Sequence, residues 1–74
     1  MKDIVIDARG LLCPLPVLRL RKRLQEIEAG TIVTLVATDP AALVDVPHFC
    51  AENGHEFLAS TEHGDTVHYR LRRA

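Results

Sequence analysis

Cys13 is the residue of this chain whose position could support chemistry. It stands between a strand-like segment and the Pro14-Leu15-Pro16 run, which we expect to open a helix. Unpaired N–H groups and the macrodipole at a helix start favour negative charge, and with assisting cations they bring a thiol pKa from about 8.5 toward roughly 3.5–7.5. We therefore predict an exposed, reactive thiolate. The alternative is a small core residue, because free cysteine is often buried.

The loop before Cys13 is expected to fold back on the end of the strand. Gly10 suits a turn with positive φ, which residues with side chains adopt only with strain. Asp7 ends the strand and is expected to accept hydrogen bonds from loop amides. A direct proton role for Asp7 is disfavoured, since a carboxylate touching the sulfur would raise the pKa of the thiol.

Pro14 and Pro16 are expected to stiffen the start of the helix. They fit only its first turn, where their missing N–H groups are not needed. The amides of Leu15 and Val17 then stay free to point at the sulfur.

Other nucleophilic and metal chemistries have weaker support in the sequence. A redox pair would need C-x-x-C, and the zinc-like run His48-x-Cys50 lacks clustered partners, so we expect neither a metal nor a cofactor. So short a chain is also expected to lack a cleft of the usual ~300–1,000 Å³. What remains is a lone activated thiol, which can hold a sulfur atom as a persulfide and present it to another protein. None of the four histidines lies in a hydrolase signature; they are His48, His55, His63 and His68.

The first half of the chain reads as strand, helix, strand. β-branched residues predict a strand at 4–7. Apolar residues three and four apart predict a helix over about 14–29, with Gly30 at the position after its C-cap. A segment that is apolar on both faces predicts an interior strand at 31–37. The apolar positions of the helix are Val17, Leu20, Leu24 and Ile27.

The second half reads as helix, strand, strand. Asp39-Pro40 predicts a helix start, and Asn53-Gly54 its end. Pro47 predicts a break near 45–47, where Asp45 would cap the second piece. Strands are expected at 57–61 and 66–72, joined by a turn at 62–65. The residues expected on the core face of this helix are Leu43, Val46 and Cys50.

This βαβαββ order predicts an α+β fold with a single domain over residues 1–74. A right-handed crossover places the first helix on one face of the sheet, and the second helix packs beside it. The result is a two-layer sandwich in which a mixed four-stranded sheet carries two helices on one face.

Composition excludes several classes of protein. Nine Lys+Arg against ten Asp+Glu argue against a strongly basic nucleic-acid binder, and 47% hydrophobic residues exclude a disordered chain. No apolar run approaches the ~20 residues of a membrane span. Met1-Lys2-Asp3 lead directly into the first strand without a signal peptide, so we expect a cytoplasmic protein. Two cysteines are too few for a disulfide scaffold.

The basic run at 19–23 is the densest charged segment. Arg19 and Lys22 are candidates to support the sulfur and to dock a partner, or else they form a solvated helix face. Cys50 is expected to be a buried structural cysteine, with a resolving or second sulfur-bearing role as the alternative.

The run Asp7-x-x-Gly10-x-x-Cys13-Pro14-x-Pro16, followed by a basic helix, resembles the TusA family of small sulfur carriers, also called the SirA family. The resemblance implies the βαβαββ sandwich and a persulfide on Cys13. It implies a donor, either a cysteine desulfurase or a rhodanese-like protein, and an acceptor protein in tRNA 2-thiolation, cofactor sulfur supply or dissimilatory sulfur oxidation. Further matching segments are 21–22, 39–41, 45–50 and 69–73.

Two positions depart from the pattern of the best-known relay protein of that family. Leu15 stands where an acidic residue is often found, and Arg9 where an apolar residue is common. Both would face a docking partner, so the sulfur-transfer interpretation holds while the pathway stays open. A carrier with one exposed thiol is expected to act as a monomer. The alternative is an RNA- or ribosome-associated module without thiol chemistry, but 4% aromatic residues leave few stacking platforms.

Overall fold

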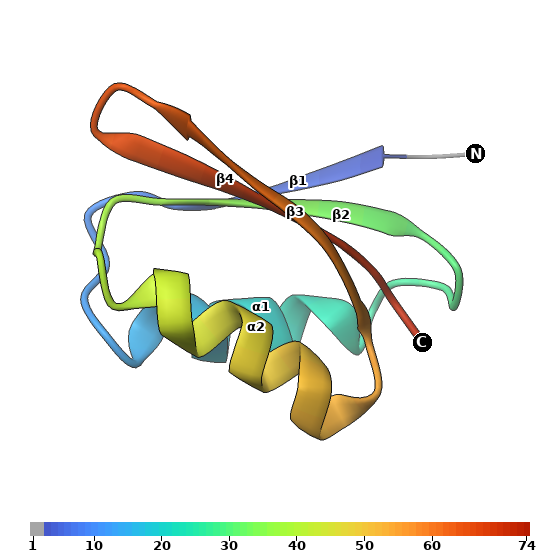
Figure 1. The fold of residues 1–74 in the computed structure, drawn as a ribbon. Helices are drawn as coiled ribbons and strands as arrows, with labels where there is room; N and C mark the ends of the chain where they lie inside the picture. The colour runs from blue at the N-terminus through green and yellow to red at the C-terminus, as the bar shows by residue number, and fades with distance from the viewer. Residues whose placement is uncertain (1–2) are drawn as a thin grey trace.

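The computed structural model describes residues 3–74, which form strands and helices in the predicted order (Figure 1). Met1 and Lys2, on which the prediction of a missing signal peptide depends, lie outside the described residues. The elements are β1 (Asp3–Ala8), α1 (Leu15–Leu24), β2 (Ile32–Ala37), α2 (Ala42–Asn53), β3 (Glu56–His63) and β4 (Thr66–Arg72).

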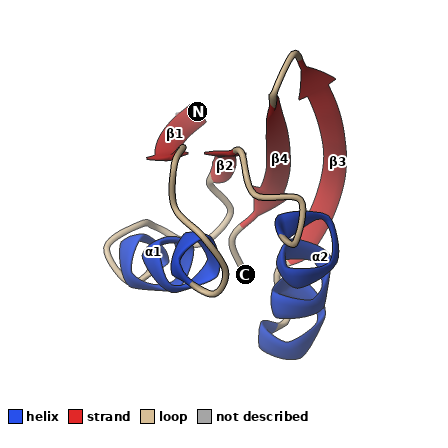
Figure 2. Ribbon diagram, turned by 90° about the vertical axis from the view of Figure 1, so that its left-hand side faces the viewer, coloured by secondary structure: helices blue, strands red, loops and turns tan. Residues whose placement is uncertain are grey.

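The four strands form one mixed sheet in the order β1-β2-β4-β3. β1 is parallel to β2, whereas β4 is antiparallel to both β2 and β3. Figure 2 shows both helices on the same side of the sheet, with α1 nearer β1 and α2 nearer β3. This arrangement confirms the predicted fold class and the interior position of β2.

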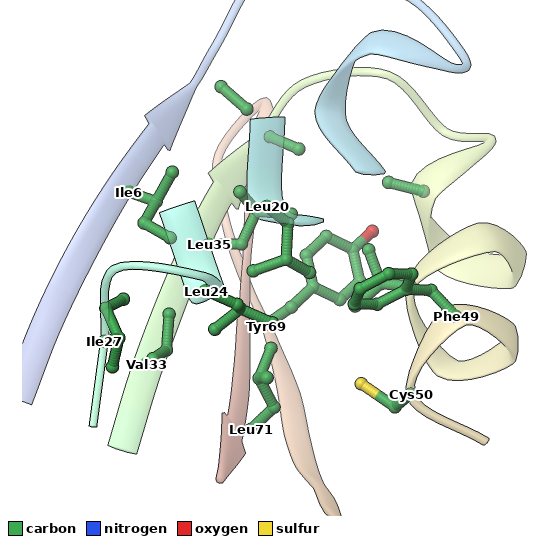
Figure 3. Packing of buried hydrophobic residues seen from close by; sticks show 14 residues of the cluster. Ile6, Leu20, Leu24, Ile27, Val33, Leu35, Phe49, Cys50, Tyr69 and Leu71 are labelled. Carbon is green, nitrogen blue, oxygen red and sulfur yellow. The ribbon is translucent and has the colours of Figure 1, made fainter. Parts of the chain in front are cut away.

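The hydrophobic core lies between the sheet and the helices (Figure 3). The two faces of β1 differ in burial, since Ile6 lies in the core while its neighbour Val5 is 63% exposed on the open face. Leu20 of α1 and Phe49 of α2 pack into the same core. Each fully buried side chain of this size contributes about 1.5–3 kcal/mol, which holds both helices on the sheet.

The first helix is shorter than predicted. α1 ends at Leu24, because the N–H groups of residues 25–27 bond to carbonyls three residues back rather than four. This tighter turn still keeps Ile27 in the core at 8% exposure. Gly30 has a positive φ of 87°, but it follows the turn and donates its N–H to Arg73 instead of ending the helix.

The second helix runs without the predicted break. α2 includes Pro47, whose missing N–H removes one helical bond, the one to the carbonyl of Leu43. Leu43 was predicted to face the core, yet it is 49% exposed, and Ala42 is buried in its place. Asp45 does not cap a second piece. Gly54 ends the helix with a φ of 75°, as predicted.

Parallel pairing of β1 and β2 brings two loops together. The carboxyl ends of both strands, Ala8 and Ala37, are paired at the same edge of the sheet. The loop at 9–14 leads from this edge into α1, and the loop at 38–41 leads into α2. Ligands and chemistry concentrate at such edges.

Candidate functional site

Cys13 lies in the loop between β1 and α1 with its side chain exposed. Gly10 has the predicted positive φ, 78°, and donates its N–H to the Thr38 hydroxyl at 2.9 Å. Pro14 is the N-cap of α1, Pro16 lies in its first turn, and the Cys13–Pro14 peptide bond is cis. The exposure predicted for Cys13 is therefore confirmed, and its alternative as a core residue is wrong.

Asp39 ties the second loop to the backbone of Cys13. Its Oδ2 accepts the Cys13 N–H at 2.6 Å, and its Oδ1 accepts the Ala41 N–H at 3.1 Å. These two bonds hold the pKa of the Asp39 carboxyl below its usual range. The sequence predicted Asp39 only as a helix start, so its contact with the site was missed.

Asp45 accepts a hydrogen bond from the thiol itself. The Cys13 Sγ lies 2.9 Å from Asp45 Oδ2, in the first turn of α2. This bond, with some desolvation and the negative charges of Asp45 and Asp39, raises the pKa of the Cys13 thiol above its ordinary value.

The predicted lowering of that pKa is therefore wrong. The helix start was expected to supply free amides, but the Leu15 N–H donates to the Leu12 carbonyl at 2.8 Å. Two carboxylates reach the cysteine from another loop and helix, and both disfavour a negative charge on the sulfur. Cys13 at rest is a protonated thiol that is hydrogen-bonded to a carboxylate.

Arg19, one of the two residues predicted to support the sulfur, lies at the end of β1 with Asp7 and Arg9. Asp7 accepts the Arg9 N–H at 3.0 Å, as expected for a loop amide, and it also pairs with the Arg9 guanidinium at 2.9 Å. These bonds lower the pKa of Asp7 to about 2. Arg19 donates to the Asp7 carbonyl at 2.8 Å, so it braces this strand end.

An open groove of about 310 Å³ adjoins Cys13 between the two helices. It contradicts the expectation that so small a chain has no room for a cleft. The arginine that α1 contributes to it is Arg21, whereas Arg19 and Lys22 are outside its lining. His48 and Glu52 of α2 form an exposed pair at 3.1 Å in its wall. The lining residues are Cys13, Pro14, Val17, Leu18, Arg21, Asp45, His48, Phe49, Glu52 and Asn53.

Apolar side chains near Cys13 remain uncovered. Leu12 is 69% exposed, and Leu15 and Leu18 are each 49% exposed. Leu15 is thus accessible to a partner, and its contact with one stays a prediction.

Cys50 has the predicted structural position. It is 1% exposed in the core, and burial raises the pKa of its thiol to about 11. Figure 3 shows its sulfur directed from α2 into the core.

Residues 3–74 contain no group of three or more His, Cys, Asp or Glu side chains placed to hold a metal ion. Within the same residues, no helix is both long enough and apolar enough to cross a membrane.

The residues missed by sequence reasoning are Asp39, Asp45 and Arg21. A signal for the two carboxylates was present, because both follow β2 in the chain and β2 was predicted beside the strand that precedes Cys13. The direction in which the Arg21 side chain points depends on the residue at which α1 begins. The sequence did not predict that residue to within one position.

Comparisons with known proteins agree with this fold. The family model described as "Sulfurtransferase TusA" matches residues 4–73. The sulfur carrier protein TusA of Pseudomonas entomophila is 42% identical over 71 residues, which cover 96% of this chain and 89% of that protein. TusA of Allochromatium vinosum is 36% identical over 72 residues, covering 97% and 95%. A crystal structure of a SirA-like protein from Desulfitobacterium hafniense superimposes with a TM-score of 0.76 at 29% identity, covering 93% of this chain and 95% of that one.

Proposed function

This chain belongs to the TusA family of sulfur carrier proteins, and from that premise we propose that Cys13 is the residue that carries the sulfur. The observation that supports it most is that Cys13 is exposed in the lining of the groove, while Cys50, the other thiol, is buried.

The cargo on Cys13 is proposed to be one sulfane sulfur, held as a persulfide. A donor R–S–SH and the Cys13 thiol exchange to Cys13–S–SH and R–SH. The donor's S–S bond breaks as a new one forms, so no external oxidant or reductant is needed. Delivery to an acceptor thiol is the same exchange in reverse. In this sense the protein acts as a sulfurtransferase that relays sulfur between proteins.

A sulfur carrier needs a partner that supplies sulfur and a partner that receives it. We propose a cysteine desulfurase or a rhodanese-like protein as donor. The acceptor would serve tRNA 2-thiolation, cofactor sulfur supply or dissimilatory sulfur oxidation. The whole chain would act as one monomeric carrier domain in the cytoplasm.

The loop around the cysteine is proposed to hold it for these partners. Asp7, Gly10, Pro14 and Pro16 would shape the loop, as their bonds and backbone conformations support. The proposed docking residues are Arg9, Leu15, Arg19 and Lys22.

The test is to load the protein from a cysteine desulfurase supplied with L-cysteine and to weigh it intact. The parent and Cys50→Ser proteins should each gain the mass of one sulfur atom, and a reductant should remove it. Cys13→Ser should gain none. A Cys13→Ser protein that loads as fully as the parent would falsify the assignment.

The alternative RNA-binding module has little support in the structure. Tyr69 and Phe49 are buried, and Phe57 packs against the core. The chain's three aromatic rings are therefore not offered as stacking platforms for bases.

A further inference from the structure

The exchange of sulfur described above does not use the Asp45 carboxylate, although this group is hydrogen-bonded to the reactive sulfur. Asp45 Oδ2 lies 2.9 Å from Cys13 Sγ, within the range for direct proton transfer. Asp45 is anchored in the first turn of α2, and α2 is held by its buried residues Val46 and Phe49. The carboxylate therefore meets the sulfur from a rigid element. The other charged or titratable side chains around this pair are Asp39, Arg21, His48 and Glu52.

We propose that Asp45 is the proton acceptor for sulfur transfer at Cys13, a role that rests on the sulfur-carrying function proposed above. In the free carrier, Asp45 holds Cys13 as a thiol. During transfer it takes the thiol proton and returns it to the leaving group.

The step balances in atoms and electrons. Asp45 Oδ2 takes the proton from Cys13 Sγ, and the sulfur lone pair attacks the outer sulfur of the donor R–S–SH. The donor's S–S bonding pair goes to its inner sulfur, which leaves as a thiolate. The proton on Asp45 then passes to that thiolate. The products are Cys13–S–SH and R–SH, and the Asp45 carboxylate is restored.

The other carboxylates near the site are already engaged. Both oxygens of Asp39 accept backbone N–H groups, from Cys13 and from Ala41. Asp7 pairs with Arg9. Among the carboxylates of residues 3–74, Asp45 is thus the one that accepts a hydrogen bond from the thiol itself.

This arrangement also explains why a carrier would accept a raised thiol pKa. A thiolate exposed on the surface reacts with oxidants and alkylating agents wherever it meets them. A thiol that is bonded to its own proton acceptor is protected against reactions that need a free thiolate. It still reacts with a persulfide, whose leaving group needs the proton that Asp45 holds.

The first experiment compares two reactions of the same sulfur in Asp45→Asn. Alkylation by iodoacetamide needs a thiolate but returns no proton to the leaving iodide. Loading from glutathione persulfide needs the thiolate and also a proton for the glutathione thiolate that leaves. Loss of the carboxylate should speed alkylation at neutral pH, because the thiol ionises more easily. The rate of loading relative to alkylation should fall by about a hundredfold or more, since a general base usually contributes at least that much.

The second experiment is the pH profile of loading. In Asp45→Asn, the rate should fall about tenfold per pH unit below the thiol pKa, in step with the thiolate. In the parent, the hydrogen-bonded thiol is itself the reactive form, so the fall over the same pH range should be shallower. Ionisation of glutathione persulfide is common to both proteins and cancels in their ratio.

Two variants serve as controls. Glu52→Gln removes a negative charge from the same face of α2 without touching the sulfur, and it should leave the ratio within about twofold of the parent. Asp45→Glu keeps the carboxylate and should restore part of the lost ratio. Far-UV circular dichroism and the thermal midpoint show that each variant is folded.

The outcomes separate this proposal from the proposed function. If Asp45→Asn changes loading and alkylation by the same factor, Asp45 is not the proton acceptor, although Cys13 still carries the sulfur. If the parent protein gains no sulfur on Cys13 from glutathione persulfide or from the desulfurase, the carrier assignment itself is wrong.

Discussion

The two thiols of this chain reach a raised pKa by opposite routes. Burial in the core raises the pKa of the Cys50 thiol, because a thiolate there would be cut off from water. Cys13 is exposed, and the pKa of its thiol is raised mainly by one hydrogen bond to Asp45. The pKa alone would class both as unreactive. The difference lies in access and in where the proton can go, because Cys13 has a proton acceptor beside it.

The same contrast exists in how each thiol is held. Cys50 is positioned by apolar packing between α2 and the sheet. Cys13 is positioned by polar contacts from a second loop and the start of α2. Packing of the first kind supports stability, whereas contacts of the second kind allow a partner to reach the sulfur.

The largest expected difference between the thiols is in labelling. With a disulfide reagent under native conditions, Cys13 in Cys50→Ser should react at least about a thousandfold faster than Cys50 in Cys13→Ser. Cys50 requires opening of the core, which costs a large part of a stability of about 5–15 kcal/mol. The absorbance of the released thiol measures both rates. In denaturant the two rates should become similar, and a large native rate for Cys50 would contradict its buried position.

The second-largest difference is expected in how much each cysteine contributes to the free energy of unfolding. Cys50→Ser places a hydroxyl in the core and should lower the free energy of unfolding by about 1–3 kcal/mol. Cys13→Ser is a surface change and should stay within about 0.5 kcal/mol of the parent. Urea unfolding followed by circular dichroism measures both. Equal losses would show that Cys13 is also part of the packed structure.

Alkaline pH should reveal the burial of Cys50. Its pKa is about 11 in the folded protein, against about 8.5 for an unfolded cysteine. The unfolded state therefore loses its proton first, and this contribution to stability is full below about pH 8.5 and lost as pH rises toward 11. Between about pH 7.5 and pH 10, Cys50→Ala should lose about 1–2 kcal/mol less than the parent in urea unfolding. The opposite sign would mean that the folded protein favours the Cys50 thiolate.

A glycine pair tests the loop of Cys13 with the smallest effect. Gly10 and Gly64 both have positive φ, 78° and 64°, and both have open space where a Cβ would stand. Alanine at either position should cost about 1 kcal/mol through backbone strain. Gly10→Ala should also change the rate at which Cys13 is loaded, whereas Gly64→Ala, in the β3–β4 turn, should not. Equal loading rates would show that the loop does not need this turn.

The order of the elements followed from local patterns. The β-branched residues in β1, the helical spacing in α1 and the breakers at Gly54 and Gly64 each lie within a few residues of the element they define. Element ends were less predictable. Periodicity continued to Ile27 although the helix stopped at Leu24, because a tight turn can keep a residue on the same face as a helix. Pro47 was tolerated because it removes only one helical bond.

The sequence by itself determined the fold class, the family resemblance and the choice of Cys13 as the chemical residue, since proline, glycine and hydrophobic spacing act locally. Only the tertiary structure decided what touches the sulfur. Asp39 and Asp45 lie 26 and 32 positions away, and they reach Cys13 through the parallel pairing of β1 and β2. Long-range register of this kind leaves no local pattern, which is why the thiol was predicted to ionise easily and instead keeps its proton.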